Sequence, residues 1–71
     1  MRVTAELLPG RREESVELGP TARGVDLLRA LRLAPDAHIL IRGDGPIPAD
    51  ESLRDGERIR VIGVVSGGVS A

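Results

Sequence analysis

Residues 58–68 read RIRVIGVVSGG, and this stretch decides how the rest of the chain is interpreted. Its first part, residues 58–65, is rich in β-branched residues, which predicts a strand that pairs within a sheet. Alternation along the strand points three side chains toward the core, namely Ile59, Val61 and Val65. Residues 66–68 are a serine and two glycines with almost nothing to pack, which predicts a thin, flexible tail.

The composition indicates one small domain with an aliphatic core. The chain has 71 residues, no Cys, and no Phe, Tyr or Trp. At this size a hydrophobic core is barely sufficient, so nearly every Val, Leu and Ile has to be used. The lack of Cys excludes disulfides and thiolate metal sites. We therefore expect a single domain over residues 1–65 and a flexible C-terminal tail over residues 66–71.

Charge and hydropathy argue against nucleic-acid and membrane partners. The net charge is −1, so the basic footprint of a nucleic-acid binder is missing. Without aromatic residues there are no stacking platforms for single-stranded RNA or DNA. No apolar run is long enough for a membrane span, and residues 1–14 carry charges where a signal peptide needs an apolar stretch. These features predict a cytoplasmic protein.

The first half of the chain predicts a hairpin followed by a helix. Residues 2–8 and 15–18 alternate apolar and polar side chains around a Gly-containing loop, as paired antiparallel strands do. Thr21 is a candidate N-cap for a helix over residues 22–32, where apolar side chains recur at helical spacing. Pro35 closes this helix, because proline disfavours helical geometry in the residue before it.

The second half predicts two more strands, at residues 37–42 and 58–65. A dense turn at residues 43–46 and a tight Asp55-Gly56 turn separate them, with Leu53 as an apolar anchor between the turns. The complete order predicts an α+β fold, a mixed sheet of about four strands with one helix packed on one face.

This order resembles the β-grasp fold of ubiquitin-like proteins, and three motifs in the last half strengthen the resemblance. Residues 38–48 look like the apolar strand, Gly turn and extended piece of the sulfur carriers. Residues 53–59, LRDGERI, look like their Leu-x-Asp-Gly-Asp-x-Val turn, and residues 64–68, VVSGG, like their terminal Val-x-Gly-Gly. The chain is similar to the ThiS/MoaD family of sulfur carriers and to the small ubiquitin-like modifiers of archaea and thermophilic bacteria.

The resemblance implies a carrier and not an enzyme. In that family a ubiquitin-activating-like (ThiF/MoeB-type) enzyme uses ATP to adenylate the terminal glycine carboxylate, here that of Gly68, with Gly67 as its spacer. The activated group then becomes a thiocarboxylate for a sulfur-acceptor enzyme, or is joined to lysine on target proteins. Because residues 69–71 follow, a peptidase such as a JAMM-type metalloprotease would first cut between Gly68 and Val69. The carrier itself binds no permanent cofactor.

The outer face of the last strand is the candidate docking surface. It comprises Arg58, Arg60, Ile62 and Val64, with Val65 and Ser66 at the start of the tail. Exposed aliphatic side chains grouped on one sheet face commonly mark a partner site. The alternative is a one-residue shift in register, which would bury the same side chains.

All ten basic residues are arginine, and this admits two interpretations. One is a compositional bias toward arginine. The other is functional, because a chain activated at its own C-terminus then has no lysine amine to capture the activated group.

Two other classes of function stay open. One is a ubiquitin-like binding module that docks and never reacts, and the other is the small subunit of a molybdopterin-synthase-like enzyme. The chain offers no Ser/His/Asp or Cys/His set for catalysis, because His38 is the single histidine and there is no Cys. A lone histidine without Cys or His neighbours is also no metal site.

Overall fold

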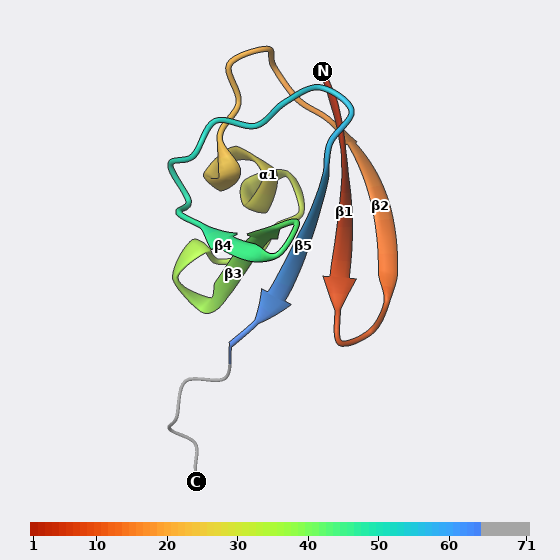
Figure 1. Ribbon diagram of the computed structural model, residues 1–71, viewed down its shortest axis with the longest axis vertical. Coiled ribbons are helices and arrows are strands. Elements are labelled where there is room, and N and C mark those ends of the chain that lie inside the picture. Colours follow the sequence, from red (N-terminus) through yellow and green to blue (C-terminus); the bar gives the residue numbers. More distant parts are fainter. Residues whose placement is uncertain (65–71) are drawn as a thin grey trace, which may run out of the picture.

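The computed structural model describes residues 1–64. Its elements, in chain order, are β1 (Arg2–Leu8), β2 (Arg12–Glu17), α1 (Gly24–Ala30), the 3-10 helix η1 (Pro35–Ala37), β3 (His38–Arg42), β4 (Gly45–Ile47) and β5 (Arg58–Gly63). Figure 1 shows α1 packed across one face of the sheet, with the other face uncovered by any helix. The predictions made for Val65, Ser66, Gly67, Gly68 and Val69 lie outside the described residues.

The five strands form one mixed sheet in the order β2-β1-β5-β3-β4. β5 occupies the centre, where it pairs in parallel with β1 and antiparallel with β3. The chain passes from β1 to β5 through β2, α1, β3 and β4, and α1 makes the crossover from β2 to β3 that the element order predicted.

The expectation of about four strands was one strand too low. The sequence predicts a turn over residues 43–46. In the structure the turn is shorter, because Gly45–Ile47 pair with β3 as a short edge strand. The reversal needs only Gly43 and Asp44, because Gly43 takes a φ of 60° that suits a two-residue hairpin turn. A three-residue strand that contains proline carries too weak an alternation to be recognised from sequence.

The core is aliphatic throughout and lies between the sheet and α1. The buried apolar residues are Val3, Ala5, Ala22, Leu27, Leu28, Leu40, Leu53, Ile59 and Val61. The three central strands β1, β3 and β5 supply the sheet's share of this core, and Leu7 and Leu40 lie opposite Val61 in the neighbouring strands. Full burial of an aliphatic side chain contributes about 1.5–3 kcal/mol, so a core this small has little to spare.

The helix is shorter at both ends than predicted. Its N-cap is Arg23 and not Thr21, and Asp26 accepts a hydrogen bond from the Arg23 backbone N–H at 2.8 Å. At the other end Arg32 has a φ of 61°, and Leu33 N–H donates to the Leu28 carbonyl at 2.8 Å. This reversal is a Schellman motif, which ends the helix before Pro35 can act on it.

Gly24 is needed where α1 begins, because the helix comes very close to β3 and to the segment after β4 there. A Cβ added to Gly24 would lie 2.3 Å from Leu40 Cδ1 and 3.1 Å from the Ala49 carbonyl oxygen. Leu40 is itself buried and the carbonyl belongs to the backbone, so neither neighbour can move aside freely. The absence of a side chain therefore sets how closely α1 packs on the sheet.

We predict that Gly24→Ala lowers the free energy of unfolding by up to about 2 kcal/mol. Helix propensity alone favours alanine by about 1 kcal/mol, but overpacking a filled core costs about 1–3 kcal/mol. Urea denaturation measures the difference. Gly10→Ala is the matched control, since nothing lies within 4 Å of a Cβ at that position. A Gly24→Ala protein more stable than the parent would show that the close approach is not limiting.

Candidate functional site

The site predicted from sequence is the end of β5, and the structure shows how that end is held. Val64 N–H donates to the Ala37 carbonyl at 2.8 Å, which fixes the last described residue to η1. The His38 ring lies beside it, with Nδ1 2.8 Å from the Ala34 carbonyl oxygen. The carbonyl can only accept, so Nδ1 carries a proton and the ring has a structural contact. Among residues 1–64 no cluster of His, Cys, Asp or Glu could hold a metal ion.

The beginning of β5 is held by the Asp55-Gly56 turn that the sequence motif identified. Gly56 adopts a φ of 82°, and its N–H donates to the Arg2 carbonyl at 2.7 Å. In return the Arg2 backbone N–H donates to Asp55 Oδ1 at 2.8 Å. The turn therefore attaches directly to the first residue of β1 and starts the parallel pairing that carries β5 through the sheet.

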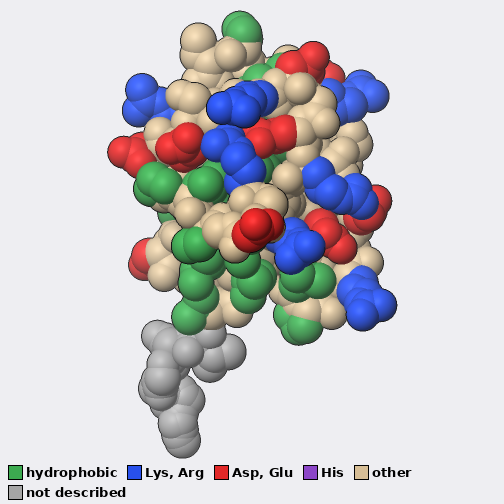
Figure 2. All heavy atoms as spheres, viewed as in Figure 1, with side chains coloured by type: hydrophobic (Ala, Val, Ile, Leu, Met, Phe, Trp, Pro, Cys, Tyr) green, Lys and Arg blue, Asp and Glu red, His purple; other side chains and the backbone are tan. Residues whose placement is uncertain are grey.

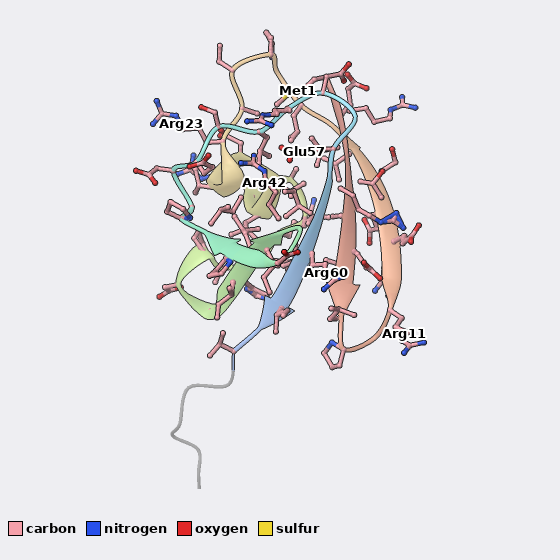
Figure 3. The ribbon with its side chains drawn as sticks, in the orientation of Figure 1. Met1, Arg11, Arg23, Arg42, Glu57 and Arg60 are labelled. Atoms are coloured by element: carbon pink, nitrogen blue, oxygen red, sulfur yellow. The ribbon has the colours of Figure 1, made fainter. Side chains whose placement is uncertain are left out.

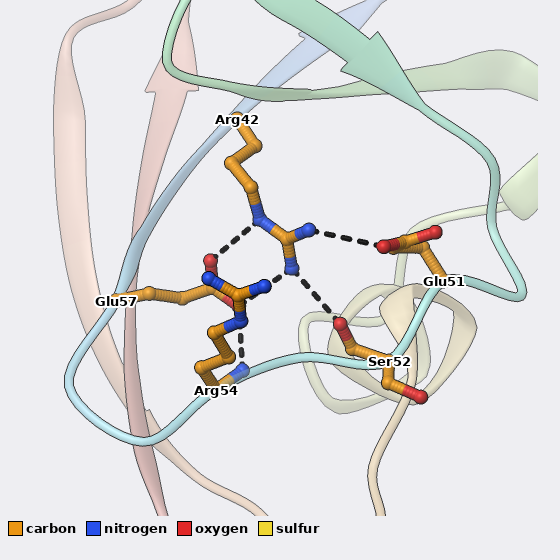
Figure 4. A network of polar contacts seen from close by, with 5 residues as sticks. All are labelled: Arg42, Glu51, Ser52, Arg54 and Glu57. Carbon is orange, nitrogen blue, oxygen red and sulfur yellow. Dashed lines mark hydrogen bonds and ion pairs between the residues drawn. The ribbon is translucent and has the colours of Figure 1, made fainter.

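A polar network supports the same turn from the other side (Figure 4). Arg42, at the end of β3, donates through Nε to Glu57 Oε1 at 2.8 Å and through Nη1 to Glu51 at 3.1 Å. A further bond reaches the Ser52 carbonyl at 2.9 Å. Glu57 also accepts the Arg54 backbone N–H at 2.6 Å. One guanidinium thus ties β3 to the connection between β4 and β5.

The two central charges of this network change each other's pKa. Burial acts to raise the pKa of Glu57, but the hydrogen bonds from Arg42 and from the Arg54 backbone, together with the positive charge of Arg42, hold it below its usual value. The Glu57 hydrogen bond in turn raises the pKa of Arg42. Both groups therefore stay charged at neutral pH.

The face of the sheet opposite α1 is divided into an apolar half and a charged half. Near the end of β5, Ile62 lies between Leu8 of β1 and Ile39 of β3 as their direct strand partner. Ile39 and Val64 are 43% and 46% exposed, and Ile41 is half-buried nearby. We call these residues the open-face patch: Leu8, Ile39, Ile41, Ile62 and Val64. Figure 2 shows hydrophobic side chains gathered at this end of the molecule.

The charged half begins in the row where Arg60 lies between Ile41 of β3 and Glu6 of β1. Arg60 pairs with Glu6 of β1 at 3.7 Å, and Arg58 is hydrogen-bonded to Glu13 of β2. Figure 3 shows Arg60 on β5, at the boundary between the two halves. These cross-strand ion pairs lie at the surface and contribute little to stability. They leave both guanidinium groups matched by acids of the same sheet.

The structure therefore places four of the predicted docking residues on one face of the sheet, beside three further apolar residues that the sequence analysis did not include. Arg58, Arg60, Ile62 and Val64 lie on the outer face, while Ile59 and Val61 are buried. The missed residues are Leu8, Ile39 and Ile41. Their signal is present in residues 38–42, HILIR, because three successive apolar residues require one face other than the core. Only the strand order shows that this second face meets Ile62.

Solved structures share the architecture of this chain. The chain superposes on SAMP1 from Haloferax volcanii with a TM-score of 0.75 at 20% identity, covering 96% of this chain and 100% of that one. It also superposes on the UBL domain of Plasmodium falciparum Dsk2 with a TM-score of 0.71 at 18% identity, covering 89% and 96%. At these identities the likeness establishes the fold, which is the ubiquitin-like β-grasp predicted from sequence.

The family follows from the sequence itself. Residues 1–65 match the family model described as small archaeal modifier protein 2, and the chain belongs to this family. No curated protein matches the chain. The protein is thus a small ubiquitin-like modifier, a carrier or substrate protein and not an enzyme. None of the helices in residues 1–64 is both long and apolar enough to cross a bilayer.

We predict that Glu57→Gln lowers the free energy of unfolding at pH 7 by about 2 kcal/mol, because hydrogen bonds to charged groups contribute about 1.5–3 kcal/mol. The Glu57 pKa is lower in the folded state, so its contribution is complete above the unfolded value of 4.5 and is lost as the pH falls below it. Thermal unfolding between neutral pH and pH 3 measures both effects.

Glu51→Gln is the matched control, because the Glu51 side chain is 41% exposed against 14% for Glu57. We expect it to cost less than about 1 kcal/mol, as exposed ion pairs do. Equal losses in the two variants, or an unchanged acid response in Glu57→Gln, would contradict the role given to Glu57.

Proposed function

We propose that this protein is an acyl carrier of the ubiquitin-like type, activated at the carboxylate of Gly68 after removal of residues 69–71. The observation that carries the proposal is the position of Gly67-Gly68 in the sequence, shortly after the central strand β5 (Arg58–Gly63) of a modifier-family β-grasp domain, with residues 64–66 between. A glycine pair at an arbitrary position would not indicate a carrier, because short motifs of this kind also occur by chance. Its place next to a strand held at both ends supports a terminus presented to a partner.

The proposed chemistry has two steps before any acceptor is involved. A peptidase, of JAMM type by family resemblance, hydrolyses the amide between Gly68 and Val69 and leaves a free carboxylate. A ThiF/MoeB-type enzyme then joins this carboxylate oxygen to the α-phosphate of ATP and releases pyrophosphate. Glycine suits both steps, because a residue without a Cβ passes through a narrow channel and leaves its carbonyl open to attack.

The acyl-adenylate then loses AMP to a nucleophile, and the nucleophile decides the outcome. Attack by a sulfur donor leads to a thiocarboxylate, which suits a sulfur-acceptor enzyme. Attack by a lysine amine, directly or through an enzyme cysteine, forms an isopeptide bond and makes the protein a modifier. Membership in a modifier family favours the second outcome. Both reactions depend on ATP and place the protein in the cytoplasm.

The open-face patch is the surface we propose for docking on the activating enzyme. It lies at the end of β5 from which the chain continues toward Gly68, so a partner that holds it also controls the approach of the tail. Exposed aliphatic side chains at a site of this kind supply binding energy when a partner buries them. Arg58 and Arg60 border the patch and form ion pairs with Glu13 and Glu6 of the same sheet. We therefore expect them to affect how a partner is oriented more than how tightly it binds.

Intact mass of the protein purified from its native cells tests the proposal. We expect a species that ends at Gly68, with a gain of about 16 Da where the carboxylate has become a thiocarboxylate. Exclusively full-length protein that ends at Ala71 would overturn the proposal. It would favour the ubiquitin-like binding module that never reacts, or a small subunit of a molybdopterin-synthase-like enzyme, which co-purifies with a larger partner.

The docking surface has its own test. Ile39→Asp is expected to raise the KM for the carrier in the ATP–pyrophosphate exchange reaction of the activating enzyme by tenfold or more, since a buried hot spot contributes about 2 kcal/mol. Ser15→Asp is the control, because Ser15 is exposed on the same sheet face but at its far edge strand. Circular dichroism verifies that both variants fold. An unchanged KM for Ile39→Asp would exclude the patch from docking.

A further inference from the structure

The end of β5 is bonded to a short turn as well as to its neighbouring strands. Val64 N–H donates to the Ala37 carbonyl at 2.8 Å, and Ala37 is the last residue of η1, which leads from α1 into β3. The last listed partners in the β3–β5 register are His38 and Gly63, so this bond lies one pair beyond that register. The position of η1 therefore decides whether the pairing of β5 extends to Val64.

The His38 side chain fixes η1 in turn. His38 Nδ1 donates to the Ala34 carbonyl at 2.8 Å, and the same carbonyl accepts the Ala37 N–H at 3.1 Å. The ring also lies beside β5, because a Cβ added to Gly63 would have His38 Cδ2 and Nε2 as its nearest neighbours, both at 3.8 Å. We call Ala34, Ala37 and His38 the η1 anchor. Its hydrogen bonds run from the imidazole ring, through the turn, to the N–H of Val64.

The η1 anchor also sets the length of chain between the sheet and Gly68. Backbone hydrogen bonds in an antiparallel ladder join every second residue pair. Counting back from Val64, the next residue of β5 bonded to β3 is therefore Ile62, which is also the last that pairs with β1. Gly68 lies four residues after Val64 and six after Ile62, so its greatest distance is about 14 Å from the first and about 21 Å from the second. Loss of the Val64 bond thus adds two residues to this segment.

We infer that His38 is a positioning residue: through η1 it keeps Val64 on the sheet and so limits how far the Gly68 carboxylate can lie from the docked domain. The inference rests on the proposed activation at Gly68. Docking through the open-face patch fixes the domain on its partner, and the segment after Val64 then has to bring Gly68 to ATP. The effective concentration of a tethered group falls roughly as the −3/2 power of tether length, or more steeply. Two added residues therefore lower it about twofold or more.

Amide hydrogen exchange of the full chain, followed by NMR, tests the η1 anchor without a partner enzyme. The readout is the exchange rate of Val64 N–H relative to that of Ile62, which corrects for changes in global stability. His38→Phe keeps a ring beside Gly63 but removes the donor, and we expect this ratio to rise about fivefold, as for the loss of one hydrogen bond. His38→Asn places an amide N–H near the position of Nδ1 and is expected to keep the ratio within about twofold of the parent. An unchanged ratio in His38→Phe, or an equal rise in both variants, would overturn the inference.

ATP–pyrophosphate exchange by the activating enzyme tests the effect on Gly68, with the carrier that ends at Gly68 as the proposed function expects. We expect His38→Phe to lower kcat about twofold or more with KM unchanged, because the side chains of the open-face patch are intact. His38→Asn is expected to retain the parent kcat. A Gly-Ser insertion between Ser66 and Gly67 of the parent is expected to lower kcat by a similar factor and to leave Val64 exchange unchanged.

A parent-like kcat in either His38→Phe or the insertion variant would overturn the inference. Failure of the proposed function gives a different result, since the parent carrier itself then supports no pyrophosphate exchange. The Val64 exchange ratio still decides in that case whether His38 holds the end of β5.

Discussion

The parallel pairing of β1 with β5 is the constraint on which the rest of the structure depends. It places the last strand in the centre of the sheet, where Ile59 and Val61 are buried under α1. It also requires a long connection, which runs through β2, α1, β3 and β4, since parallel neighbours cannot be joined by a tight turn. Because parallel strands end at the same edge, β5 ends beside the β1–β2 loop and away from Met1. The edge of the sheet at which β5 ends is a consequence of this one pairing.

An aliphatic core of this size leaves little margin, and the molecule compensates through backbone and polar contacts outside it. The Asp55-Gly56 turn joins the start of β5 to Arg2 by a reciprocal pair of hydrogen bonds. Arg42 fastens the preceding segment through Glu51, Ser52 and Glu57. Gly24 lets α1 approach β3 more closely than any side chain would permit. Each of these contacts stabilises the frame around the central strand.

The two ends of the sheet differ in character. The uncovered face of the sheet is apolar near the end of β5 and consists of ion pairs further along it. The N-terminal amine is engaged at the other end of the sheet, by Leu18 and Glu17.

The sequence by itself determined the class of fold, the alternation that buries Ile59 and Val61, and the turn at Asp55-Gly56. These are local properties, set by side-chain period and by a glycine at positive φ. Tertiary structure alone decided which distant residues meet: the strand order that gathers Leu8 and Ile39 around Ile62, the network centred on Arg42, and the contacts of the Met1 amine. Local pattern does not encode the neighbours of a strand, because pairing partners are chosen by the packing of the whole chain.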